Sequence, residues 1–156
     1  MKILLALIVL LFPVSALAAD CYGPAEMEAE QGIRIHSELM VIGLNCQHMT
    51  PAGQKNFYAQ YRQFTAMHES LFSNYENRLI SHFRKNGSSN PESALNDLRT
   101  GFANKISNDA AQMRPDIFCA RYVDRLTRAA TMDRASLKTW AATPFPSHPV
   151  SRPMCR

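Results

Sequence analysis

Apolar residues recur every three or four positions along most of the chain after residue 24, which is the spacing of one face of an α-helix. Four such segments follow one another, and each opens at a proline: Pro24, Pro51, Pro91 and Pro115. Proline is well tolerated in the first turn of a helix, because its missing N–H would have no intrahelical partner there. No segment alternates apolar and polar residues over the length of a strand. The pattern therefore predicts an all-α protein.

The first two predicted helices carry the most apolar residues. The first runs from about residue 25 to residue 46, and Leu39–Leu44 is apolar nearly all round, which indicates deep burial. The second is the longest, from about residue 51 to residue 84. Its apolar stripe is largely aromatic, and His68 lies at the centre of that stripe.

The third predicted helix opens at Pro91 and the fourth at Pro115, and the pattern leaves open whether the fourth is continuous to residue 142. Four helices joined by short turns pack most simply as an up-down-up-down antiparallel four-helix bundle. Residues 143–156 (TPFPSHPVSRPMCR) contain four prolines and are not expected to be helical. We expect them to lie as an extended, proline-rich strap over the bundle.

The first nineteen residues have the composition of a secretory signal peptide. Lys2 supplies the positive start, residues 3–14 are apolar, and Ala16–Ala18 provides a small-residue cleavage site. Removal of residues 1–19 leaves a helical domain over residues 20–142 and the tail over residues 143–156. We therefore expect an exported protein, periplasmic or secreted, with no later segment able to span a membrane.

The formal net charge is +4 at pH 7, and one of these positive charges belongs to the predicted signal peptide. This mild excess is well below the basic footprint of a nucleic-acid-binding protein. Nucleic acid is therefore not expected as a partner.

The chain contains four cysteines, and an even number in an exported protein predicts two disulfides. In an up-down-up-down bundle, Cys46 near the end of the first helix and Cys119 near the start of the fourth lie at one pole. Cys21 precedes the first helix at the opposite pole, where the strap that carries Cys155 begins. The topology therefore predicts the pairs Cys46–Cys119 and Cys21–Cys155.

Histidine and methionine side chains raise the alternative of a haem or copper site. Sulfur and imidazole ligands select copper, and a buried histidine in a helical bundle is able to ligate haem. The candidate ligands are His68, Met67, His36 and Met40. Their spacing argues against such a site, because they are spread over several helical levels and methionine is an ordinary filler of helical cores. We expect no metal or cofactor, and a neutral His68 hydrogen-bonded to a tyrosine or a backbone carbonyl.

Arg121, Arg125 and Arg128 share one face of the fourth predicted helix. Such a face is able to bind an anionic partner, such as lipopolysaccharide or an acidic protein. The alternative is a solvated surface whose charge is offset by nearby aspartates. No HExxH, no GxSxG and no phosphate-binding glycine loop occurs, so the sequence gives no indication of an enzyme.

Four short stretches resemble a family of small, uncharacterised secreted helical proteins of alphaproteobacteria: SELMVIGLNCQ, NFYAQYRQF, GFANKIS and FCARY. The resemblance covers roughly residues 33–122. It implies that Cys46 and Cys119 belong to the shared framework of the family. It implies no activity, ligand or catalytic residue.

The sequence thus predicts an exported, non-enzymatic helical protein that acts as a binding or accessory factor for an envelope component. The first alternative is a haem- or copper-binding periplasmic bundle that uses His68 with methionine or histidine partners. A hydrolase with a site that the sequence does not display is the second alternative.

Overall fold

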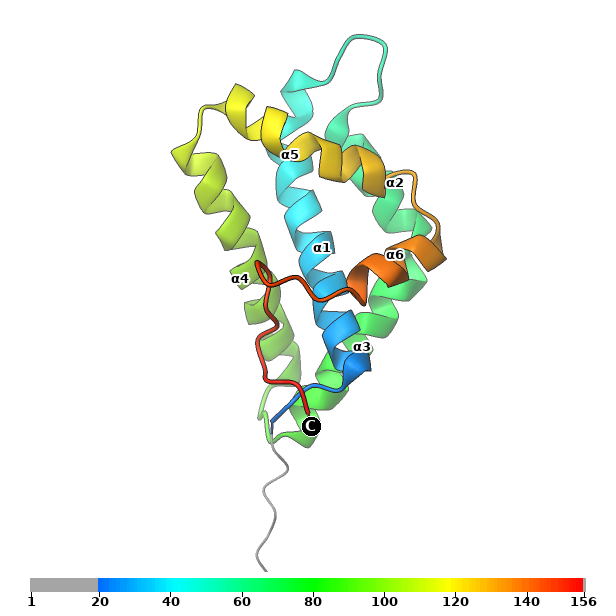
Figure 1. Ribbon diagram of the computed structural model, residues 1–156, viewed down its shortest axis with the longest axis vertical. Helices are drawn as coiled ribbons and strands as arrows, with labels where there is room; N and C mark the ends of the chain where they lie inside the picture. Colours follow the sequence, from blue (N-terminus) through cyan, green and yellow to red (C-terminus); the bar gives the residue numbers. More distant parts are fainter. Residues whose placement is uncertain (1–19, 156) are drawn as a thin grey trace, which may run out of the picture.

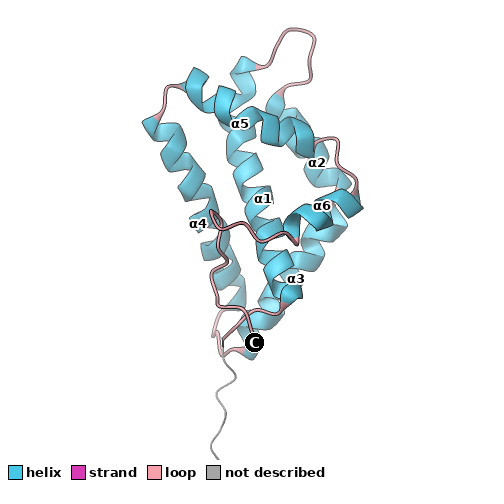
Figure 2. Ribbon diagram, viewed as in Figure 1, coloured by secondary structure: helices cyan, strands magenta, loops and turns pink. Residues whose placement is uncertain are grey.

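Six α-helices occupy most of residues 20–155, the part of the chain that the computed structural model describes (Figures 1 and 2). They are α1 (Pro24–Cys46), α2 (Phe57–Met67), α3 (Glu69–Lys85), α4 (Pro91–Gln112), α5 (Pro115–Ala129) and α6 (Arg134–Ala141). A single 3-10 turn, Gln47–Met49, follows α1. The all-α class is confirmed, whereas the signal peptide predicted for residues 1–19 lies outside the described residues.

Helix α1 is the central element, because it contacts each of the other five α-helices. Its apolar side chains Ile33, Leu39 and Ile42 are fully buried. At Gly32 the backbone of α1 lies so close to α3 that an added Cβ would overlap the ring of Tyr75. Figure 1 shows α5 running across the C-terminal end of α1 rather than alongside it. Five helices around one central helix were not expected, and the up-down-up-down four-helix arrangement is not confirmed.

The prediction of one long helix over residues 51–84 is wrong in two respects. Helix α2 begins at Phe57 rather than near Pro51, because Asn56 caps it by accepting hydrogen bonds from two backbone N–H groups. Before that cap the chain turns at Gly53, whose φ of 78° suits glycine. The second difference is a break at His68, which separates α2 from α3.

At this break the backbone of His68 leaves the helical conformation, with φ −110° and ψ 13°. The N–H of His68 donates to the carbonyl oxygens of Phe64 and Thr65, and its own carbonyl accepts from Leu71 and Phe72. The hydrogen-bonded ladder therefore continues through the bend with little loss. The bend lets both α2 and α3 pack on α1.

The fourth predicted helix also divides, which the sequence had left open. Helix α5 ends at Ala129, and α6 begins at Arg134 after a short turn. The carboxylate of Asp133 accepts a hydrogen bond of 2.7 Å from the backbone N–H of Ser136, which caps the start of α6. This turn directs α6 back across α1.

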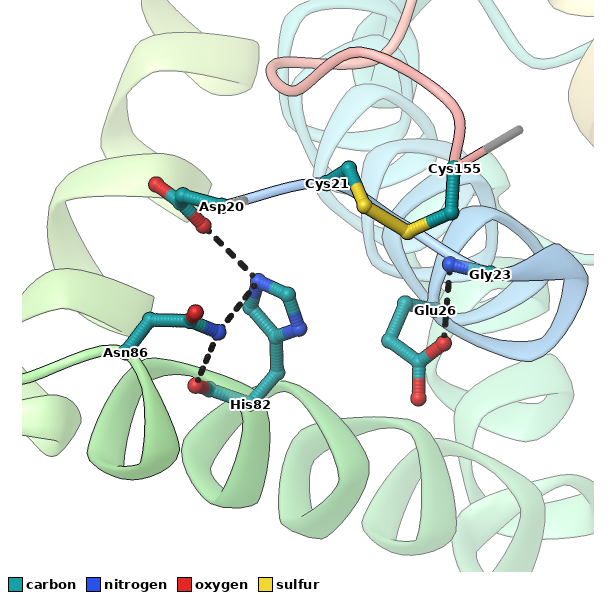
Figure 3. Close-up of a disulfide and its surroundings, with 7 residues drawn as sticks. All are labelled: Asp20, Cys21, Gly23, Glu26, His82, Asn86 and Cys155. Atoms are coloured by element: carbon teal, nitrogen blue, oxygen red, sulfur yellow. Dashed lines mark hydrogen bonds and ion pairs between the residues drawn. A yellow bond between two sulfur atoms is a disulfide. The ribbon is translucent and has the colours of Figure 1, made fainter. Parts of the chain in front are cut away.

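Both disulfides have the pairing expected from the sequence. Cys46 is bonded to Cys119 with their Cα atoms 5.6 Å apart, and this bond joins the end of α1 to the first turns of α5. Cys21 is bonded to Cys155 with their Cα atoms 5.1 Å apart, so the two ends of the described chain lie together (Figure 3).

Residues 143–155, the described part of the C-terminal strap, contain no helix. The strap passes along α1 toward its N-terminal end (Figure 1). There the N–H of Tyr22 donates to the carbonyl of Pro153, and the N–H of Cys155 donates to the carbonyl of Tyr22. The structure thus has an extended C-terminal strap that lies over the helices.

Candidate binding pocket

Helix α1 buries a row of polar and charged side chains in its middle turns, which the hydrophobic pattern did not reveal. They are Glu30, Gln31, Arg34, Ser37 and Glu38, each no more than 5 % exposed. Most of their partners lie far away in the sequence, on the strap and on α5. A buried polar side chain is stable only when it is hydrogen-bonded, so these residues fix where the strap and α5 lie.

Three hydrogen bonds link backbone groups of the strap to side chains of α1. The amide of Gln31 donates to the carbonyl oxygen of His148 across 2.7 Å, and Arg34 donates to the carbonyl oxygen of Pro149 across 2.6 Å. One carboxylate oxygen of Glu30 accepts from the backbone N–H of Ser151 across 2.7 Å. Because the strap has no helix or sheet of its own, these side chains satisfy backbone groups that would otherwise need water.

Arg34 is enclosed by the strap, by α4 and by its own helix. Its guanidinium lies 4.4 Å from the centre of the Phe102 ring and 3.7 Å from the carboxylate of Glu30. Burial lowers the pKa of Arg34, and the carboxylates of Glu30 and Glu38 oppose that shift. Its Nε atom is buried and has no hydrogen-bond partner among the described residues.

Glu38 is the second buried carboxylate of this region. It accepts a hydrogen bond of 2.6 Å from Arg125 of α5, and the ring of His148 on the strap lies 3.9 Å from its other oxygen. Burial lowers the pKa of His148 despite this carboxylate, which favours the neutral ring. Glu38 therefore has Arg125 as its charged partner.

Several of these side chains line a pocket of about 500 Å³, here named the arginine pocket. Helix α1 contributes Gln31, Arg34 and Ile35, and helices α5 and α6 with the turn between them contribute Arg125, Arg128, Met132 and Trp140. The strap contributes Phe145, Ser147 and His148. The lining includes three arginines and no aspartate or glutamate.

Of the arginines singled out in the sequence, two line this pocket. Arg125 and Arg128 line it from α5, whereas Arg121 does not, and its guanidinium lies 5.5 Å from the ring of Tyr122. The three therefore do not act as one surface. The sequence did not predict that Arg34, Trp140 and His148 line the pocket. They are far apart in the sequence and come together only in the folded chain.

The residues of the haem or copper alternative have ordinary structural surroundings. The Nε2 atom of buried His68 lies 3.1 Å from the carbonyl oxygen of Met132, to which it donates. A structural His68 bonded to a backbone carbonyl was one of the expected arrangements. The neighbouring Met67 is 55 % exposed and points away from this core position.

His36 is the other histidine of that alternative. Its Nε2 atom lies 3.0 Å from the hydroxyl of Tyr61 and 3.1 Å from that of Thr65. Burial, and to a lesser extent the charge of Arg99, lowers the pKa of His36 to about 4. Met40, one turn further along α1, is partly buried against the core. In residues 20–155 no three His, Cys, Asp or Glu side chains are grouped so as to hold a metal ion.

A second hollow of about 650 Å³ lies between the start of α1, α3 and α6. Part of its charge is paired, whereas Lys85 and Arg134, which also line it, have no ion-pair partner among the described residues. Glu26 pairs with Arg78 at 3.7 Å, and Glu28 accepts from Tyr75 at 2.7 Å and pairs with Lys138 at 3.9 Å. Its lining includes the carboxylates of Glu26 and Glu28, which repel an anion, whereas the lining of the arginine pocket includes no carboxylate.

No family model, curated protein or solved structure matches this chain. None of the helices within residues 20–155 is long and apolar enough to cross a membrane. The two disulfides are compatible with an exported protein.

Proposed function

We propose that the protein is an exported, non-catalytic binding protein that holds an anionic ligand in the arginine pocket on behalf of another component of the cell envelope. The observation that carries this proposal is the lining of the pocket, with three arginines and no carboxylate. Positive charge that is partly removed from water is stabilised by an anion that replaces the lost solvent. The pocket volume of about 500 Å³ falls in the range typical of small-molecule sites.

The exported location rests on the signal-like residues 1–19 and on the presence of four cysteines. The resemblance to small secreted proteins of alphaproteobacteria agrees with export and assigns no ligand. A binding role is preferred to an enzymatic one because guanidinium and apolar groups predominate around the pocket, although Ser147 and His148, whose side chains are hydrogen-bonded across 2.8 Å, also line it. A guanidinium stays protonated at neutral pH and so serves poorly as a general base.

The experiment is native mass spectrometry of the full chain, expressed with its own first nineteen residues and isolated from the exported fraction without denaturation. We expect a chain that begins near Asp20 and carries a bound anionic species. The variants Arg125→Gln and Arg128→Gln should lose that added mass, whereas Arg121→Gln, which makes the same charge change on the same helix, should keep it.

A bound species that survives equally in all three variants would contradict the proposed site. A visible spectrum of the same sample tests the haem and copper alternative. A Soret band or stoichiometric copper that disappears in His68→Phe would contradict the proposal and favour that alternative.

A further inference from the structure

The arginine pocket has an apolar part as well as a charged one. Ile35, Met132, Trp140 and Phe145 come from α1, from the α5–α6 turn, from α6 and from the strap, and all four line the same space. Phe145 is 42 % exposed although it is a large aromatic side chain on a segment that lies against the protein. Apolar side chains that meet at a pocket gain free energy when a ligand covers them.

The charges around the pocket do not cancel. Arg34 and Arg125 have the buried carboxylates of Glu30 and Glu38 as their respective neighbours, at 3.7 Å and 2.6 Å. Arg128 has no ion-pair partner among the described residues, and its Nε donates to the backbone carbonyl of Asp124. The pocket and its ion pairs therefore carry an excess of one positive charge. A ligand with a single negative charge neutralises that excess, whereas a strongly polyanionic one exceeds it.

A second observation points to a missing polar partner. The guanidinium of Arg34 lines the pocket with only 5 % of the residue exposed, and its Nε is buried without a hydrogen bond among the described residues. A buried N–H without a partner costs about 1–3 kcal/mol. Because Nε is itself buried, a carboxylate in the pocket supplies that partner only when the side chain of Arg34 turns toward it.

We propose that the arginine pocket binds a single-headed carboxylate amphiphile, that is, one carboxylate attached to an apolar chain or ring system. This inference rests on the proposed function and narrows its ligand to one chemical class. The carboxylate lies against Arg34 and Arg128, and the apolar body covers Trp140 and Phe145. The strap forms part of the pocket wall, so a bound ligand also stabilises the position of the strap.

The experiment uses the chain's single tryptophan, Trp140, which lines the pocket and reports binding by its fluorescence. The purified full-length mature protein is titrated with hexanoate, octanoate and decanoate below their micelle concentrations, and calorimetry checks the stoichiometry. We expect one site, with affinity rising about fourfold for each methylene that enters the pocket. Decanol has the same chain without the charge, and we expect it to bind at least about tenfold more weakly than decanoate. Naphthoate tests whether a ring system serves as well as a chain.

Matched variants locate the site. Arg128→Gln should weaken decanoate binding about tenfold, and Arg121→Gln should change it less than about twofold. Both residues are exposed on α5, so neither substitution threatens folding. Phe145→Ser on the strap should reduce the gain in affinity from octanoate to decanoate and leave hexanoate nearly unchanged.

The outcomes separate this inference from the proposed function. Affinity that does not depend on chain length, together with loss of inorganic phosphate or acetate binding in Arg128→Gln, would overturn the ligand class and leave an anion-binding pocket. Equal effects of Arg128→Gln and Arg121→Gln would overturn the site. Failure of every anion to bind would overturn both proposals.

Discussion

Glu30 accepts a hydrogen bond from the backbone N–H of Ser151 across 2.7 Å, although 121 positions separate the two residues in the sequence. The second carboxylate oxygen of Glu30 accepts from the hydroxyl of Ser151. Glu30 is fully buried and also pairs with Arg34. This one side chain of α1 therefore binds the strap and supplies the countercharge of an arginine that lines the pocket. The strap is therefore an integral part of the fold.

The first prediction concerns this contact. Glu30→Ala leaves the N–H of Ser151 without its acceptor and the buried guanidinium of Arg34 without the carboxylate 3.7 Å away, so it should lower the free energy of unfolding by about 3 kcal/mol or more. Glu92→Ala is the matched control, because Glu92 pairs with Arg84 at 3.4 Å on the surface with more than half of each side chain exposed. It should cost less than about 1 kcal/mol. Urea unfolding followed by circular dichroism measures both, and equal losses would show that the buried contact is not important.

The second prediction concerns the close approach of α1 and α3. A Cβ at Gly32 would overlap the ring carbons of Tyr75, so Gly32→Ala must displace this ring and its 2.7 Å hydrogen bond to Glu28. Overpacking of a core costs about 1–3 kcal/mol, which exceeds the gain of about 1 kcal/mol in helix propensity. Gly101→Ala in α4 meets no atom within 4 Å and should be stabilising by up to about 1 kcal/mol. Thermal unfolding of the two variants should therefore shift in opposite directions, and stabilisation by both would contradict the packing described.

The helix starts were the part of the fold that the sequence predicted best. Pro24, Pro91 and Pro115 do open helices, because proline suits the first turn and the residues after each have a helical apolar spacing. Pro51 has the same signal and does not open a helix. There Gly53 provides a turn and Asn56 a stronger cap a few residues later.

The division at His68 has no such local signal, since no proline or glycine lies near it. Its cause is tertiary, because the His68 side chain bonds to the carbonyl of Met132, 64 positions away. The arginine pocket was only partly foreseen for the same reason. Arg125 and Arg128 stood out by their spacing on one helix face. Nothing in the sequence distinguishes Arg34, which is buried because the strap and Phe102 of α4 lie against it.

The third prediction concerns pH. His36 has a pKa of about 4 in the folded protein against 6.5 ordinarily, chiefly because it is buried. Between these values the unfolded chain binds a proton that the folded protein does not, so stability falls as the pH decreases from about 6.5 to 4. From pH 7 to pH 5 this group should cost about 2 kcal/mol.

Urea unfolding of the wild-type protein and of His36→Gln at both pH values measures that contribution. The variant should lose about 2 kcal/mol less than the wild type over this interval. His48→Gln is the control, since His48 is exposed and should leave the pH dependence unchanged. If His36→Gln and the wild type lose the same stability, the ring of His36 is not held in its neutral form by the fold. A direct titration of the ring by NMR should place its pKa near 4.

The last prediction separates the two means by which the strap is held. Cys21–Cys155 fixes its end, while Gln31, Arg34 and Glu30 hold its middle through hydrogen bonds to His148, Pro149 and Ser151. In Cys21→Ser/Cys155→Ser the end should open locally, because two backbone hydrogen bonds with Tyr22 and a partly exposed ion pair between Arg152 and Asp20 then remain to hold it. In the wild type the backbone N–H of residue 155 donates to the carbonyl of Tyr22. In the double variant this N–H should exchange with solvent at least about tenfold faster. The amide of Ser151 should keep most of its protection, since its acceptor Glu30 is unaffected.

Hydrogen exchange measured by NMR distinguishes the two amides, and equally fast exchange at Ser151 would mean that the disulfide alone holds the strap. Adding Glu30→Ala to the double variant should then release Ser151 as well, with the backbone of α1 around Ile42 still protected.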